Sequence, residues 1–73
     1  MSLLDRKPGE TFTVSGVRVS GEIGKRLVDM GFVEGATGTL VRRAAFRGPV
    51  HVRLGAYELV LRASEAAQIE VTP

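Results

Sequence analysis

Hydrophobic and polar residues alternate in several short runs of this chain, and the alternating runs are rich in β-branched residues. This pattern predicts strands at 11–19, 36–44, 50–54, 57–62 and 69–71. A chain of 73 residues with so many short strands most economically curls into a small barrel, because closing a sheet removes its exposed edges. The expected architecture is therefore mainly β, with about five strands in a single domain over residues 1–73.

One segment has helical instead of alternating periodicity. Ile23, Leu27 and Met30 recur at i, i+4 and i+7, which predicts a helix over about 21–30 with these three residues on its buried face. Ser20 stands immediately before this segment, where its hydroxyl can cap the first turn. The chain therefore carries one α-helix inserted after the first strand.

Short helical turns are expected at two further places. "SLLDRKPGE" predicts a turn of helix near the N-terminus that ends at Pro8-Gly9. Ser64 is placed to cap a single turn over 64–67. Both turns are too short to change the fold class.

Four glycines stand where a backbone constraint is expected. Gly31 fits the left-handed position that ends a helix, and Phe32 falls where an apolar residue packs back on that helix. Gly35 marks the turn into the next strand, and Gly16 predicts a bulge in the first one. Gly38 occupies a position where an inward aliphatic residue would be expected, which indicates close backbone packing.

Gly55-Ala56 separates two alternating runs and is typical of a type II′ hairpin turn. Counting outward from the turn fixes the register of the two strands. One face then carries the pairs Leu54–Tyr57, Val52–Leu59 and Val50–Leu61, and the other carries Arg53–Glu58 and His51–Val60.

Composition narrows the class of protein. There is no cysteine, which excludes disulfides and thiolate metal sites and fits a reducing compartment. The N-terminal residues contain no long apolar stretch of the signal-peptide kind, and no segment approaches the ~18 apolar residues of a membrane span. We therefore expect a soluble, cytoplasmic domain without direct membrane insertion.

The net charge of +2 is unevenly distributed along the chain. Residues 1–35 are neutral, residues 63–73 are acidic, and residues 36–62 contain five arginines against Glu58 alone. Such a stretch can attract an acidic partner, a lipid headgroup or RNA. It can equally be a solvated surface that keeps a small protein in solution.

Motifs for catalysis or for cofactor binding are not convincing. "GEIGKR" resembles a phosphate-binding loop, but Val19 and Arg26 stand where that motif needs Gly and Ser or Thr. His51 is the sole histidine, whereas a metal site needs several converging ligands. No nucleophile, base and orienting group can be assembled around it. We expect no enzyme, no resident metal and no cofactor; a metal site shared between subunits stays open.

Surface recognition is the remaining class. Phe46 lies between Arg43 and Arg47 in the "AAFRGP" loop, and aromatic residues beside arginines are enriched at binding centres. The alternative is a Phe46 side chain folded over the end of the barrel.

The order of these features resembles the FeoA family, accessory proteins of bacterial ferrous-iron uptake. "RLVDMGFVEG" is similar to the family's Arg-Leu stretch with two glycines, and "LDRKPGE" to its opening before a Pro-Gly. "VRRAAFRGPVHVRLGAYELVLRASEAAQIEV" is similar to the rest. Two positions depart from the pattern: Gly38 replaces an expected inward aliphatic residue, and Ala45 stands where the family often has proline. The likeness covers nearly the whole chain.

The resemblance implies an SH3-like β-barrel and a protein that assists FeoB, a membrane Fe(II) permease with a cytosolic GTP-binding domain. It implies no catalytic residues and no firmly placed metal site, and it leaves association with Fe(II) as an alternative that the spacing of ligands does not support. It also implies a cytoplasmic protein held at the inner membrane through its partner. Whether the protein forms homo-oligomers is not decided by the resemblance.

Three hypotheses follow. The first is binding or regulation of the FeoB permease through a surface that contains Arg43, Phe46, Arg47, His51 and Arg53. The second is a small basic barrel that binds nucleic acid by stacking bases on aromatics and tracking phosphates with arginines. The third is a metal-sensing accessory domain like the SH3-like domains of iron-dependent repressors, although the chain has no helix-turn-helix pattern.

Overall fold

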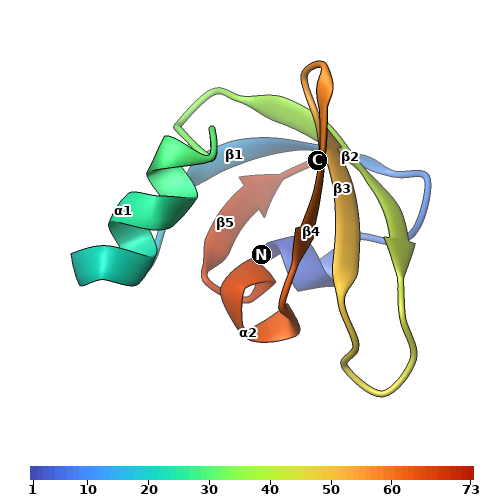
Figure 1. Ribbon diagram of the computed structural model, residues 1–73. Coiled ribbons are helices and arrows are strands. Elements are labelled where there is room, and N and C mark those ends of the chain that lie inside the picture. The colour runs from blue at the N-terminus through green and yellow to red at the C-terminus, as the bar shows by residue number, and fades with distance from the viewer.

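The computed structural model describes residues 1–73, and it confirms the mainly β fold class. Five strands form one antiparallel sheet in the order β4-β3-β2-β1-β5, with α1 on one side and α2 below the hairpin (Figure 1). In chain order the elements are the 3-10 turn η1 (Leu3–Asp5), β1 (Thr11–Val17), α1 (Gly21–Asp29), β2 (Thr37–Arg43), β3 (Val50–Leu54), β4 (Tyr57–Leu61), α2 (Ala63–Ala66) and β5 (Ile69–Thr72).

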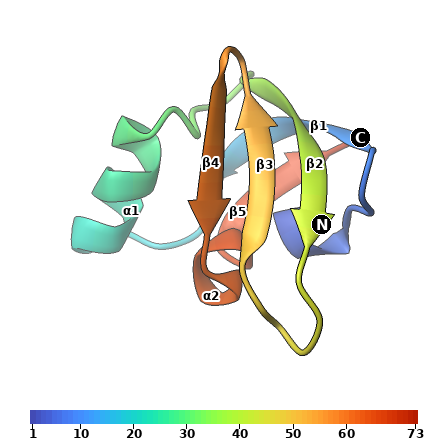
Figure 2. The same ribbon diagram turned by 45° about the vertical axis from the view of Figure 1, so that its right-hand side comes forward.

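The sheet curls strongly but does not close into a complete barrel. Figure 2 shows β4, β3 and β2 side by side in front, with β1 and β5 behind them. The edge of β5 is covered by the N-terminus, because Ser2 bridges to Glu70 and the Val71 N–H donates to the Met1 carbonyl at 2.9 Å. The outer edge of β4 pairs with no other strand. The expected barrel is thus open between β4 and β5.

Thirteen buried apolar side chains fill the curl of the sheet, among them Phe12 and Phe32. Gly38 lies directly against this core. A Cβ atom at Gly38 would lie 2.7 Å from Cζ of Phe12 and 2.5 Å from the carbonyl oxygen of Arg53. The close backbone packing expected at this glycine is confirmed.

The β3–β4 hairpin has the predicted register at all five pairs. Gly55 has φ of +60°, as the first central residue of a type II′ turn requires. Tyr57 pairs with Leu54 as predicted, but its side chain is 73% exposed, so it does not join the apolar core. It lies at the tip of an edge strand, where the curled sheet no longer covers it.

Helix α1 packs two of its three predicted residues against the core. Gly24 and Leu27 are buried and Met30 is half-buried, whereas Ile23 is 55% exposed. Gly24 packs directly against the backbone of Val19. A Cβ atom at Gly24 would lie 2.2 Å from the Val19 carbonyl oxygen, so only glycine allows α1 to approach this backbone so closely. The prediction that Ile23 is buried is wrong, because the neighbouring Gly24 faces the core instead and the spacing of apolar residues does not indicate a glycine contact.

The end of α1 follows the prediction closely. The Gly31 N–H donates to the Val28 carbonyl at 2.9 Å and the Phe32 N–H to the Leu27 carbonyl at 3.1 Å, which is the Schellman pattern. Gly31 has φ of +111°, and Phe32 and Leu27 both lie in the core. The turn at Gly35, with φ of +90°, is confirmed as well.

The two predicted serine caps are not formed. Ser20 has the N-cap position of α1 but makes no side-chain hydrogen bond there. Helix α2 begins one residue earlier than expected, so Ser64 lies inside it. Its first turn is capped by Glu65, whose Oε1 accepts the Arg62 N–H at 2.9 Å.

Two bulges bend the sheet. The ladder between β1 and β5 shifts register between Val14 and Gly16, as Gly16 predicted. A second shift lies between Leu40 and Arg42 in β2, and no feature of the sequence indicated it. No helix in the protein is both long enough and apolar enough to cross a membrane.

Candidate partner-binding surface

The loop between β2 and β3 contains a strained turn at residues 45–48. The Gly48 N–H donates to the Ala45 carbonyl at 3.1 Å. The two central residues, Phe46 and Arg47, have φ of +58° and +59°, the pattern of a type I′ turn. Such turns favour Asn-Gly, because a left-handed conformation costs other residues about 1–2 kcal/mol each. The turn therefore holds Phe46 and Arg47 in a disfavoured conformation.

This geometry directs Phe46 away from the core. Its side chain is fully exposed, so it does not fold over the end of the sheet. An exposed aromatic held on a strained turn is a candidate contact residue, since backbone strain concentrates at functional sites.

A hollow of about 420 Å³ lies beside this loop, between the loop, η1 and the start of α2. Its lining is largely apolar, and its charged members are two arginines on the rim. The lining residues are Leu4, Arg43, Ala44, Ala45, Phe46, Arg47, Gly48 and Ala63.

A second hollow of about 360 Å³ adjoins the first and shares Leu4, Arg47 and Ala63 with it. Arg62 adds a third arginine to its rim. We call the two together the arginine-rimmed hollow, with an apolar floor at Leu4, Ala44, Ala45 and Ala63 and a rim at Arg43, Arg47 and Arg62.

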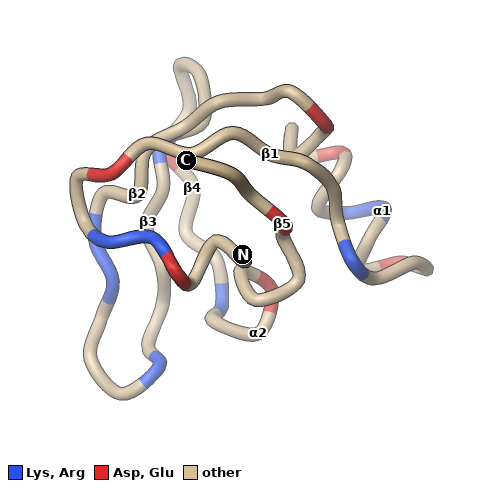
Figure 3. Tube along the Cα trace, turned by 180° about the vertical axis from the view of Figure 1, so that it is seen from behind, with Lys and Arg blue, Asp and Glu red and all other residues tan.

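The arginines of the protein fall into two sets of four. One set pairs with carboxylates: Arg18 with Glu70 at 2.8 Å, Arg53 with Glu58 at 3.2 Å, Arg26 with Glu65 at 3.3 Å and Arg6 with Glu10 at 3.6 Å. The other set has no carboxylate within ion-pair distance and consists of Arg42, Arg43, Arg47 and Arg62. All unpaired arginines thus lie in the basic stretch, and three of them form the rim. Figure 3 shows one basic position and no acidic one on the loop between β2 and β3, and further basic positions on β2 itself.

Arg43 is held at the rim by a backbone contact. Its Nη1 donates a hydrogen bond to the Leu4 carbonyl in η1. In register it faces Val50, an inward-pointing residue, so its guanidinium reaches the end of the sheet instead of the outer face. The side chain is thereby pre-positioned beside the hollow.

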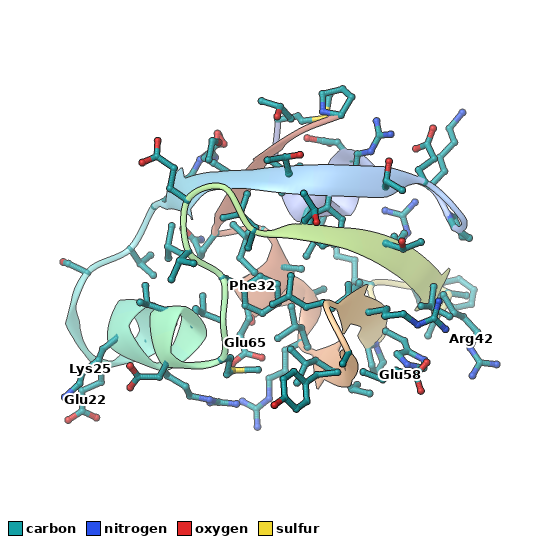
Figure 4. The ribbon with its side chains drawn as sticks, turned by 90° about the horizontal axis from the view of Figure 1, so that it is seen from above. Glu22, Lys25, Phe32, Arg42, Glu58 and Glu65 are labelled. Carbon is teal, nitrogen blue, oxygen red and sulfur yellow. The ribbon has the colours of Figure 1, made fainter.

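His51 and Arg53, the other two predicted contact residues, lie elsewhere, on the outer face of β3. Both approach Oε1 of Glu58, His51 Nε2 at 3.6 Å and Arg53 Nη2 at 3.2 Å. Figure 4 shows Arg42 and Glu58 at the same side of the molecule, with Arg42 extended into solvent. The structure therefore brings Arg43, Phe46 and Arg47 together and leaves His51 and Arg53 in a separate ion-pair cluster.

Sequence reasoning missed Leu4, Arg62 and Ala63 as members of this surface. Leu4 and Ala63 are ordinary apolar residues, and no local motif marks them. Arg62 belongs to the basic stretch, so the charge distribution alone could have singled it out. The structure contains no group of three or more His, Cys, Asp or Glu side chains that could hold a metal ion.

Comparison with known proteins decides the family. The sequence model of the FeoA domain matches residues 1–73 of this chain. The chain belongs to the FeoA family. This family of small domains serves as an accessory in ferrous-iron transport, as the resemblance of the sequence implied.

Individual FeoA proteins agree with the assignment. The solution structure of FeoA from Chlorobium tepidum has a TM-score of 0.87 and 32% identity, over 97% of this chain and 68% of its own. The structure of Stenotrophomonas maltophilia FeoA in complex with zinc has a TM-score of 0.83 and 30% identity, over 99% of this chain and 89% of its own. That protein is described as a prokaryotic SH3 domain protein, which supports the SH3-like fold.

One curated relative is much longer. It is the Fe(2+) transport protein A/Fe(2+) transporter FeoB fusion protein of Porphyromonas gingivalis, which is 39% identical over 71 residues. The match covers 97% of this FeoA-family chain but spans only 8% of the fusion protein.

Proposed function

We propose that this FeoA-family protein is a non-catalytic cytoplasmic accessory protein that binds or regulates a FeoB-type ferrous-iron permease. The observation that carries the proposal is the Porphyromonas gingivalis fusion, in which an FeoA part and a FeoB part belong to one polypeptide. Joining two modules in one chain raises their effective concentration and favours even a weak contact between them. A separate chain must make that contact through its own surface.

The arrangement of charge supports a protein contact. Four arginines lack a carboxylate partner within the protein, and the fully exposed Phe46 lies among them. Arginine and aromatic residues are enriched at the centres of protein interfaces, where a few residues dominate the binding energy. The contact surface proposed here is the region of Arg43, Phe46 and Arg47, with the outer-face cluster of His51 and Arg53 at its border.

Nucleic-acid binding receives less support. Proteins that bind single strands stack successive bases on aromatic side chains along a basic groove. The exposed aromatics here are Phe46 and Tyr57, and they lie at opposite ends of the β3–β4 hairpin. They do not form one stacking platform.

The test is a titration of this domain into the detergent-solubilised FeoB-type permease of the same organism, at about 50 and about 300 mM salt. We expect saturable binding that weakens with salt and with the Arg47→Glu or Phe46→Ala substitution. Lys25→Glu is the matched control, because Lys25 carries the same charge on the far, outward side of α1 (Figure 4). Absence of binding by the parent domain at both salt concentrations contradicts the proposal.

A further inference from the structure

We infer that the arginine-rimmed hollow binds an acidic segment of the partner protein, in which one apolar side chain lies between carboxylates. This inference rests on the proposed function and specifies which chemistry the partner presents. It follows from three independent features of the hollow: its charge, its floor and the strained turn at its edge.

The charge of the rim selects an anion. Arg43 comes from β2, Arg47 from the loop and Arg62 from the junction of β4 and α2, and none has a carboxylate partner. Guanidinium groups bind carboxylates through paired hydrogen bonds of fixed geometry. Arg43 is already oriented by its bond to the Leu4 carbonyl, so less conformational freedom is lost when it binds.

The apolar floor of the hollow favours a partner segment that carries one apolar side chain between its carboxylates. Leu4, Ala44, Ala45 and Ala63 line the recess, and the small alanine side chains leave it open. At about 420 Å³ the first hollow accommodates a side chain the size of leucine together with its main chain. Leu4 and Ala63 are half-buried and Ala44 and Ala45 are exposed, so the hollow is shallow and open to an extended protein segment.

The strained turn supplies the third feature. Phe46 and Arg47 occupy the two left-handed positions of the 45–48 turn, where Asn-Gly would be unstrained. Both residues border the hollow, and the side chain of Phe46 is fully exposed there. The strained backbone therefore presents an aromatic and a cation to solvent at the edge of the hollow, where a partner segment can contact them.

The first experiment is an NMR titration of the isotope-labelled domain with a synthetic probe peptide that carries two glutamates on each side of one leucine. We expect the shifted amides to cluster at residues 43–48 and 62–67 and to leave α1 unchanged. The matched peptide with glutamines in place of the glutamates should bind at least about fivefold more weakly. Equal binding of both peptides, or shifts located elsewhere, overturns the inference.

The second experiment replaces the turn itself. The double substitution Phe46→Asn and Arg47→Gly should raise the melting temperature, because it relieves the strain, and weaken peptide binding at least about fivefold. Arg62→Glu should weaken binding similarly, whereas Lys25→Glu should not. Unchanged peptide affinity in the relaxed turn overturns the inference. So does tighter binding of the parent to anionic lipid vesicles than to the peptide.

The permease titration separates this inference from the proposed function. If the parent binds the permease and neither the relaxed turn nor Arg62→Glu weakens that binding, the proposed function holds and the inference fails. If the parent does not bind the permease at all, the proposed function fails, and with it the inference that rests on it.

Discussion

A glycine inside a strand of this protein is required by what lies against it. At Gly38 a Cβ atom would meet a backbone carbonyl and the ring of Phe12 at less than 3 Å, and neither group can move without disturbing the core. We expect Gly38→Ala to lower the free energy of unfolding by about 1–3 kcal/mol, measured by chemical denaturation. Gly16→Ala is the control, since a Cβ atom there would have no neighbour within 4 Å; a loss as large at Gly16 would contradict the steric explanation.

Glu70 gives the protein a pH dependence at the scale of one residue. A hydrogen bond from Arg18 lowers the pKa of Glu70 below its ordinary value of 4.5, and burial opposes this shift only in part. Because the folded-state pKa is the lower one, the Arg18–Glu70 pair stabilises the fold fully above pH 4.5. That contribution is lost as pH falls through the lowered value.

The measurement is the unfolding free energy of the parent and of Glu70→Gln as a function of pH. The parent should be the more stable at neutral pH, and the difference should disappear in acid. Glu34→Gln, at an exposed turn without an ion pair, controls for general charge effects. A difference between parent and Glu70→Gln that persists unchanged in strong acid would contradict the role assigned to the pair.

At the scale of elements, local rules predicted the hairpin and the end of α1, because a two-residue turn and a C-terminal glycine determine the geometry of their own neighbours. The exposure of Ile23 on α1 was not predictable in this way. It depends on Gly24 meeting the Val19 carbonyl, a contact that apolar periodicity does not encode. The predicted serine caps failed for two reasons: Ser20 stands before α1 but its side chain makes no capping bond, and Ser64 lies inside α2 because that helix begins earlier.

Ser20 at the start of α1 and Glu65 in the first turn of α2 are expected to contribute unequally to stability. Ser20→Ala should change stability by less than about 0.5 kcal/mol, below the ~1 kcal/mol typical of an N-cap serine, because its side chain makes no capping bond. Glu65→Ala should cost about 1–3 kcal/mol, because Glu65 caps α2 and pairs with Arg26 of α1. Denaturant unfolding of both variants tests this, and equal losses would contradict it.

At the scale of the whole molecule, the sequence predicted the fold class and a small part of the candidate site. The basic stretch was visible as a charge imbalance, and Arg43, Phe46 and Arg47 were close enough in sequence to be grouped. Leu4 and Ala63 come to the same hollow only because η1 and α2 pack at that end of the sheet. Tertiary packing also separates His51 and Arg53 from the rest.

The open edge of the sheet is the remaining property of the whole molecule that sequence reasoning did not predict. In a two-residue hairpin, alternate residues of each strand turn their N–H and C=O groups away from the partner strand. In β4 these are Glu58 and Val60, and none of the hydrogen bonds of the structure uses their main-chain groups outside the sheet ladder. Their amides therefore face solvent.

We expect the amides of Glu58 and Val60 to exchange with solvent orders of magnitude faster than that of Leu59, which points toward β3. Val71 is the matched control at the other edge, where its N–H is held by Met1, and it should be protected. Hydrogen exchange measured by NMR at two protein concentrations decides the point. Protection of Glu58 and Val60 at both concentrations would contradict an open sheet. Protection that appears only at the higher concentration would mean that a second copy pairs with this edge, as unpaired strands are prone to do.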